Sequence, residues 1–77
     1  MDIANLTDDV FAAMRTTPEE AGITVNYAGE LVVIGTFGGP IVVASITEDD
    51  TVRLIIGHDD VTVPYRDAVS TIVNTFN

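Results

Sequence analysis

The sequence contains no cysteine, no lysine and no tryptophan. Without cysteine there can be no disulfide framework and no thiolate zinc site, so a disulfide-built secreted domain is excluded. No apolar run approaches the roughly 18 residues that a membrane-spanning helix needs. The first residues, Met1-Asp2-Ile3, are acidic where a secretory signal peptide would be basic. We therefore expect an intracellular, cytoplasmic protein that does not act at a membrane.

Basic residues are scarce: three arginines stand against twelve acidic residues, which gives a formal net charge of -9 at pH 7. Small domains usually carry a net charge of about 2 to 8 in magnitude. Nucleic acids and anionic membranes are bound by clustered Lys and Arg, whereas Arg15, Arg53 and Arg66 are scattered. Direct nucleic-acid or membrane binding is therefore not expected, and the favoured partner is a basic protein surface. The alternative is that the composition only maintains solubility or reflects a high-salt or GC-rich source.

The chain is short, and its 77 residues predict one small acidic domain over residues 1–77. A domain of this size buries only about 60% of its unfolded surface, so its stability margin is thin. Hydrophobic residues make up 47% of the chain and must supply the core. A subunit interface would add to a core of this size.

Helical spacing marks both ends of the chain. Apolar residues recur at three- and four-residue steps near the N-terminus, which predicts a helix over about residues 3–15. Asp8 and Asp9 are expected early in that helix, near the positive end of its dipole. The same spacing predicts a closing helix over about residues 65–76. Between them, Thr17-Pro18-Glu19-Glu20 has the arrangement of a capping box, and Gly22 limits it to a single helical turn or to a kinked extension of the first helix.

The central segment alternates with a period of two, which indicates strands. Ile23 begins the first strand, and Ala28-Gly29 is predicted to be a tight hairpin turn. Further strands are expected over residues 31–37, 41–47 and 51–56, with a short fifth strand over residues 61–63 at an edge, because Pro64 cannot donate a ladder hydrogen bond. The predicted fold class is α+β: an antiparallel four- to five-stranded meander flanked by an N-terminal and a C-terminal helix.

The middle strands are apolar on both faces. In the 31–37 strand, Leu31 and Val33 point one way while Val32 and Ile34 point the other. A sheet covered on one side would have a polar second face, so both faces need cover. Either each helix takes one face, or both pack on the same face and leave a patch for a partner or a homodimer.

Acidic residues gather at the predicted turns. In an antiparallel meander, Glu30 would share one end of the sheet with Glu48, Asp49 and Asp50. Asp59 and Asp60 would form a second group at the other end, with Glu19, Glu20 and His58. These two groups, Glu30, Glu48, Asp49, Asp50, Asp59 and Asp60, are the predicted partner-binding residues. The alternative is that aspartate occupies turns because its side chain bonds its own backbone.

Enzymatic chemistry has no motif to support it. His58-Asp59-Asp60 places the one imidazole beside two carboxylates, but adjacent side chains diverge and no third ligand is near in sequence. The glycine run at residues 35–40 connects two strands and lacks the lysine of a phosphate-binding loop. We expect no enzyme, no metal site and no cofactor.

These observations leave two functional hypotheses. Small size, strong acidity and an α+β fold are shared with many virus-encoded inhibitors that occupy the nucleic-acid-binding sites of host proteins. The first hypothesis is therefore a small acidic interaction module whose carboxylates imitate phosphates. The alternative is a homodimeric structural or assembly protein.

Overall fold

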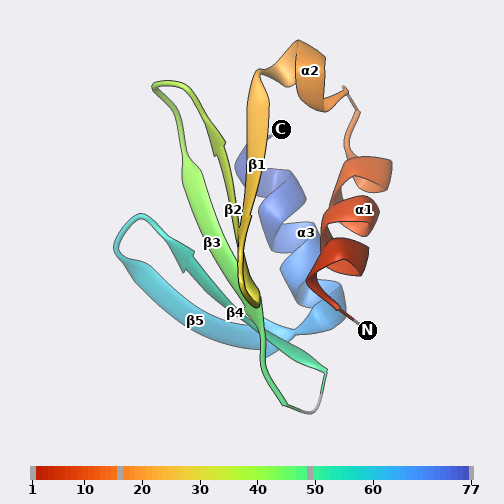
Figure 1. The fold of residues 1–77 in the computed structure, drawn as a ribbon, viewed down its shortest axis with the longest axis vertical. Helices are drawn as coiled ribbons and strands as arrows, with labels where there is room; N and C mark the ends of the chain where they lie inside the picture. Colours follow the sequence, from red (N-terminus) through yellow and green to blue (C-terminus); the bar gives the residue numbers. More distant parts are fainter. Residues whose placement is uncertain (1, 16, 49, 77) are drawn as a thin grey trace.

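The chain folds as a five-stranded sheet with a helix at each end, shown in Figure 1. The computed structural model describes residues 2–15, 17–48 and 50–76. In chain order the elements are α1 (Ile3–Ala13), α2 (Pro18–Ala21), β1 (Ile23–Ala28), β2 (Leu31–Thr36), β3 (Ile41–Ile46), β4 (Thr51–Ile56), β5 (Asp59–Pro64) and α3 (Tyr65–Phe76). This confirms the predicted α+β class.

The strands pair antiparallel in the order β1-β2-β3-β4-β5, so the sheet is a simple meander. The first hairpin turn consists of Gly29 and Glu30, because Ala28 still pairs with Leu31. The predicted turn at Ala28-Gly29 was therefore wrong by one residue. Gly29 has a φ of 64°, a left-handed value that glycine adopts without steric cost.

The fifth strand was predicted over residues 61–63 but is six residues long. It begins earlier because Asp59 and Asp60 belong to β5 and not to the preceding turn. They pair with Ile56 and Ile55 of β4. Gly57, at a φ of 61°, reverses the chain within two residues, so pairing resumes immediately. Strand β5 is an edge strand that ends at Pro64, as expected for a residue without an N–H group.

Local capping explains where the helices begin. The Oδ1 atom of Asp2 accepts a hydrogen bond from the Asn5 N–H at 2.9 Å, which makes Asp2 the N-cap of α1. Asp8 and Asp9 therefore lie beyond the first turn, and the expectation that they face the positive end of the helix dipole was wrong. Thr17 caps α2 by accepting a bond from the Glu20 N–H at 3.2 Å.

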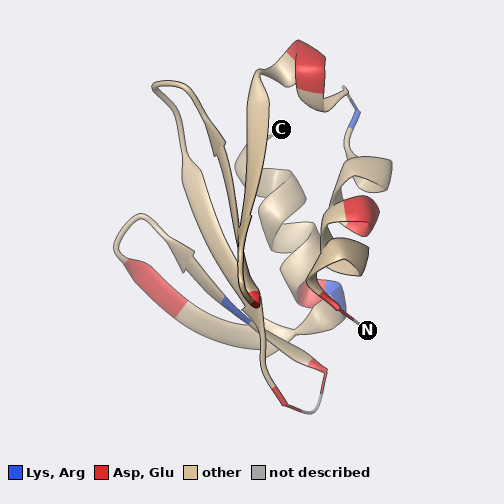
Figure 2. Cartoon of the chain, viewed as in Figure 1, with Lys and Arg blue, Asp and Glu red and all other residues tan. Residues whose placement is uncertain are grey.

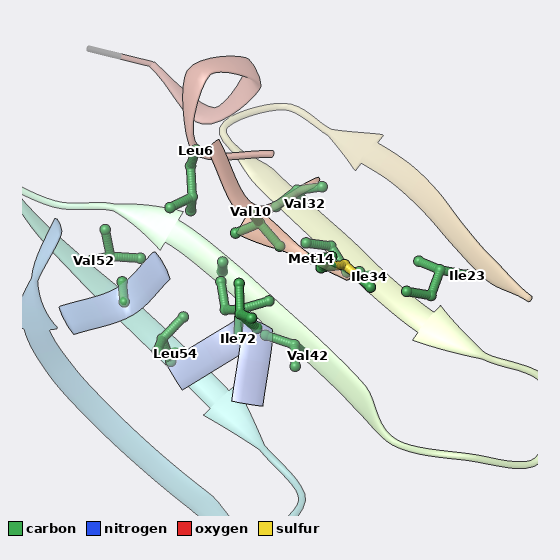
Figure 3. Packing of buried hydrophobic residues seen from close by; sticks show 13 residues of the cluster. Leu6, Val10, Met14, Ile23, Val32, Ile34, Val42, Val52, Leu54 and Ile72 are labelled. Atoms are coloured by element: carbon green, nitrogen blue, oxygen red, sulfur yellow. The ribbon is translucent and has the colours of Figure 1, made fainter. Parts of the chain in front are cut away.

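Both long helices pack on the same face of the sheet. Leu6 and Val10 of α1 and Ile72 of α3 share one core with alternate residues of the central strands (Figures 1 and 3). The strand residues on this covered face include Val32, Ile34, Val42, Ala44, Val52 and Leu54, all fully buried. Within the described residues, no helix lies over the second face of the sheet. No helix in the described part of the chain is long and apolar enough to cross a membrane.

Candidate interaction surfaces

Tyr65 is the point at which several acidic segments meet. Its backbone N–H donates a hydrogen bond to the Asp50 carbonyl oxygen at 3.0 Å, and its hydroxyl donates to Oδ2 of Asp9 at 2.5 Å. Burial, the bond to Asp9 and the charges of Asp9, Asp2 and Asp8 raise the pKa of Tyr65 to about 12. Burial is the largest cause of this rise, and the hydrogen bond to Asp9 and the charges of the neighbouring aspartates add to it.

The first hairpin turn joins the same region. Glu30 and Gly29 line a shallow hollow together with Asp2, Ile3 and Ile46. The start of α1 therefore lies beside the turn between β1 and β2. Two carboxylates that are 28 positions apart in the sequence, those of Asp2 and Glu30, thus border one hollow.

The turn between β3 and β4 carries the next two carboxylates. Thr51 holds this turn closed, because its N–H and its hydroxyl both donate to the Glu48 carbonyl oxygen, at 3.4 and 2.8 Å. Asp50 has a φ of 59°, a left-handed conformation that aspartate and asparagine tolerate better than most residues. Asp50 also lines a surface hollow with Tyr65, Arg66 and Asp67.

We call this end of the molecule the acidic pole, and Figure 2 marks acidic residues in red near the N-terminus, in α1, at the start of α3 and in the turn at the lower end of the view. It consists of seven exposed residues: Asp2, Asp8, Asp9, Glu30, Glu48, Asp50 and Asp67. Arg66 is the arginine among them. Of the predicted partner-binding residues, the pole includes Glu30, Glu48 and Asp50, whereas Asp49 lies outside the described residues.

The contribution of the two helices to the pole was not predicted. Asp9 and Tyr65 are 56 positions apart, so no local spacing links them. The pole could have been predicted in part from the meander, because an antiparallel meander brings the ends of β1, β3 and β5 to the same end of the sheet. This arrangement places the start of α3 beside the turn between β3 and β4.

The second predicted group does not form a comparable surface. Figure 2 shows the acidic segment of α2 well apart from the acidic segment at the start of β5. Successive side chains of a strand point to opposite faces, so Asp59 and Asp60 diverge. His58 is exposed in the turn before them.

Asp60 is paired with Arg53 on the uncovered face of the sheet. The Nε and Nη2 atoms of Arg53 donate to the two carboxylate oxygens at 2.9 and 2.5 Å. This hydrogen bonding lowers the pKa of Asp60 below its ordinary value. Within the second group, the negative charge of Asp60 is therefore neutralised by Arg53.

The uncovered face, which we call the open face, is largely apolar at its centre. Register pairs Val33 with Val43 and Val43 with Ile55 across three strands. Leu31 and Ile41 extend this apolar row and are 41% and 54% exposed. Phe37, in the turn after β2, is fully exposed at one end of the face.

The carboxylates of the pole are spread over a surface. Among the residues that the structure describes, no three His, Asp or Glu side chains are grouped so that they could hold a metal ion. Comparisons of the chain with protein-family models, with curated proteins and with solved structures find no match. The two surfaces themselves, the acidic pole and the open face, are thus the basis for a functional proposal.

Proposed function

We propose that this chain is a small acidic protein-interaction module that engages a basic, nucleic-acid-binding surface of a partner protein through the acidic pole. The observation that carries the proposal is that carboxylates from five separate segments, two helices, two turns and the N-cap of α1, gather at one end of the molecule. Tyr65 contacts α1 and the turn between β3 and β4, and the first hairpin turn borders the N-cap of α1. In this proposal the pole occupies the site where the partner binds nucleic acid, so the module acts as an inhibitor.

Spreading the carboxylates over a surface suits a macromolecular partner. Separated, solvent-exposed charges attract an opposite surface over distances of about one Debye length, roughly 8 Å at physiological salt. Such charges act mainly on the rate of association and on its salt dependence. A basic groove that binds regularly spaced phosphates presents complementary charges to this pole.

The pole has a better claim to the contact than the second group. Asp60 already bonds to Arg53, and its charge is therefore neutralised at short range. Asp59 is exposed at the edge of the sheet and can add to the long-range attraction. We accordingly place the contact at Glu30, Glu48 and Asp50 with the helix carboxylates beside them.

The first experiment identifies the partner and its site. Immobilised protein is used to capture binding proteins from the native host at moderate salt, and these are eluted with rising salt. The proposal expects a basic nucleic-acid-binding protein whose nucleic acid is displaced, at equal salt, by this chain. A captured partner that binds nucleic acid and this chain at the same time would contradict the proposal.

The second experiment compares two variants that lose the same charge. The pole variant carries Glu30→Gln, Glu48→Gln and Asp50→Asn, and asparagine tolerates the left-handed backbone at position 50. The control variant carries Glu19→Gln, Glu20→Gln and Asp59→Asn, away from the pole. We expect the pole variant to associate with the captured partner about tenfold more slowly and with a weaker salt dependence. Equal rates for the two variants would show that only net charge matters.

A further inference from the structure

The open face differs in chemistry from the rest of this acidic protein. Its charged side chains are Arg53 and Asp60, which neutralise each other. Its centre consists of Leu31, Val33, Ile41, Val43 and Ile55, with Gly35 among them. A contiguous apolar patch on a small protein marks a contact surface, because water exposure of such a patch is unfavourable.

The charge distribution favours a second copy of this chain as the molecule that covers the open face. Two copies of a chain with a net charge of -9 repel each other wherever their acidic surfaces meet. The open face has no net charge, and the acidic pole is made from the helices and turns around it. It is therefore the surface through which a second copy can approach at the smallest electrostatic cost. A basic partner, in contrast, is not attracted to this face, because its carboxylate, that of Asp60, already forms an ion pair with Arg53.

The open face has a ridge at Ile41 with a hollow on each side. Ile41 projects between two shallow hollows, one bordered by Val43, Ile55 and Gly57, the other by Val33 and Phe37. Gly35 pairs with Ile41 across β2 and β3, and because it has no side chain the Ile41 side chain can lie close over it: a Cβ at Gly35 would be 3.2 Å from Cγ1 of Ile41. In a two-fold arrangement each copy inserts its Ile41 ridge into a hollow of the other, as an isologous interface requires.

The size of the face limits the area that a dimer can bury. Five strands of six residues span roughly 20 by 20 Å, or about 400 Å² in projection. Protruding side chains make the accessible area larger, so a dimer would bury on the order of 1,000 Å² in total. That is the lower limit of a specific interface and well below the area of about 2,000 Å² or more that obligate dimers bury.

We propose that the open face is a homodimer interface in which the sheets of two copies of this chain stack face to face. No residue of the acidic pole lies in a strand, so both poles stay outside the stacked strands. The dimer presents two copies of the partner-binding surface and hides its apolar strands.

The test is the oligomeric state of the full chain, measured by sedimentation equilibrium from about 5 to 500 μM. We expect a species of twice the 8.2 kDa monomer mass, with a dissociation constant on the order of 10 μM. Ile41→Lys should raise this constant at least tenfold. The matched control is Val61→Lys, because Val61 is 44% exposed, similar to Ile41, but lies opposite Leu54 on the covered side of the sheet.

The control variant separates the effect of disrupting the open face from the effect of changing the net charge. Both substitutions make the protein less acidic by one unit, so reduced repulsion cannot explain dissociation in one of them alone. Leu31→Lys, at another corner of the open face, gives a second variant in case Ile41→Lys fails to fold by circular dichroism. Strand β3 lies in the middle of the sheet, so an edge-to-edge dimer would not respond to Ile41→Lys.

Two results would overturn the proposal. One is a wild-type protein that stays monomeric at the highest concentration. The other is a dimer that tolerates the folded open-face variants or dissociates equally in Val61→Lys. Salt distinguishes this proposal from the proposed function: dimerisation should strengthen as salt screens the repulsion between copies, whereas binding to a basic partner should weaken. Either proposal can therefore fail without the other.

Discussion

Tyr65 shows how one residue can join distant parts of a small domain. It is the first residue of α3, and its N–H ties that helix to the carbonyl oxygen of Asp50 in the turn between β3 and β4. Its hydroxyl reaches across to Asp9 of α1. The same residue therefore connects α3 to a turn and to the other long helix, and it does so in the most acidic region of the protein.

The titration of Tyr65 gives a direct test of this environment. Tyr27→Phe leaves Tyr65 as the remaining tyrosine, so the ultraviolet absorbance of tyrosinate reports it alone. We expect a midpoint near the pKa of about 12. Adding Asp9→Asn should lower the midpoint only partly toward the ordinary value of 10.0, because burial is the largest cause of the shift.

The same shift predicts how stability depends on alkaline pH. The folded-state pKa of Tyr65 lies above its unfolded value, so the folded protein holds this proton more tightly. Its contribution to stability is complete below about pH 10 and is lost as the pH rises toward 12. Circular dichroism at each pH shows whether the fold is intact. A midpoint near 10 in a folded protein would contradict the position of Tyr65.

At the scale of elements, the fold could be predicted largely from periodicity. The switch from helical to alternating spacing at Ile23 and back at Tyr65 located the sheet, and the bounds of β4 agree with the prediction. In the sheet, the errors lay at the turns: β1 runs one residue further before the turn at Gly29, and pairing resumes at Asp59, directly after the turn at Gly57. In α1, the helix ends at Ala13 and its first turn holds neither Asp8 nor Asp9. Spacing alone could not show which face each helix covers, because both faces of β2 and β3 are apolar.

The candidate site was predictable only where it depends on the meander. Glu30, Glu48 and Asp50 were placed at one end by strand order, and the structure puts them there. The contributions of Asp2, Asp9 and Asp67 depend on how α1 and α3 pack, which no local pattern encodes. The ion pair that neutralises Asp60 follows from β5 beginning at Asp59, and that start was missed.

The packing of α3 on the sheet predicts a large effect of Ile72→Ala. Ile72 is fully buried, and the substitution removes three carbon atoms from the core. We expect a loss of about 2–5 kcal/mol in the free energy of unfolding, measured by urea denaturation. A domain of this length has roughly 4–12 kcal/mol in total, so the loss is a large fraction of its stability.

A control on the same helix isolates the packing effect. Ser70 is exposed, so Ser70→Ala should change stability by no more than about 0.5 kcal/mol. A loss below about 1 kcal/mol for Ile72→Ala would mean that α3 is not packed in the core as described.

At the scale of the whole molecule, the acidic pole and the open face are separate surfaces. Carboxylates concentrate at the pole, around the start of both long helices, while the open face on the far side of the sheet is neutral and apolar. The separation permits self-association through one surface and attraction of a basic partner through the other. The concentration of charge also destabilises the fold, because the seven carboxylates of the pole repel one another and Arg66 is the one arginine among them.

This repulsion predicts that salt stabilises the folded monomer. Raising sodium chloride from about 10 to 300 mM shortens the Debye length from about 30 Å to less than 8 Å, which screens most of the repulsion between exposed carboxylates. We expect the melting temperature to rise by several degrees, measured by calorimetry in the Ile41→Lys background. That background matters because salt also favours the proposed dimer, and dimerisation would raise the melting temperature by mass action.

The triple variants locate the source of the repulsion. The pole variant should have a higher melting temperature at low salt and a smaller salt response than the control variant that loses three charges elsewhere. The reason is that charges at the pole have more like-charged neighbours within one Debye length. Equal salt responses of the two variants would mean that the destabilisation comes from net charge alone, and that the carboxylates of the pole repel one another no more than the rest.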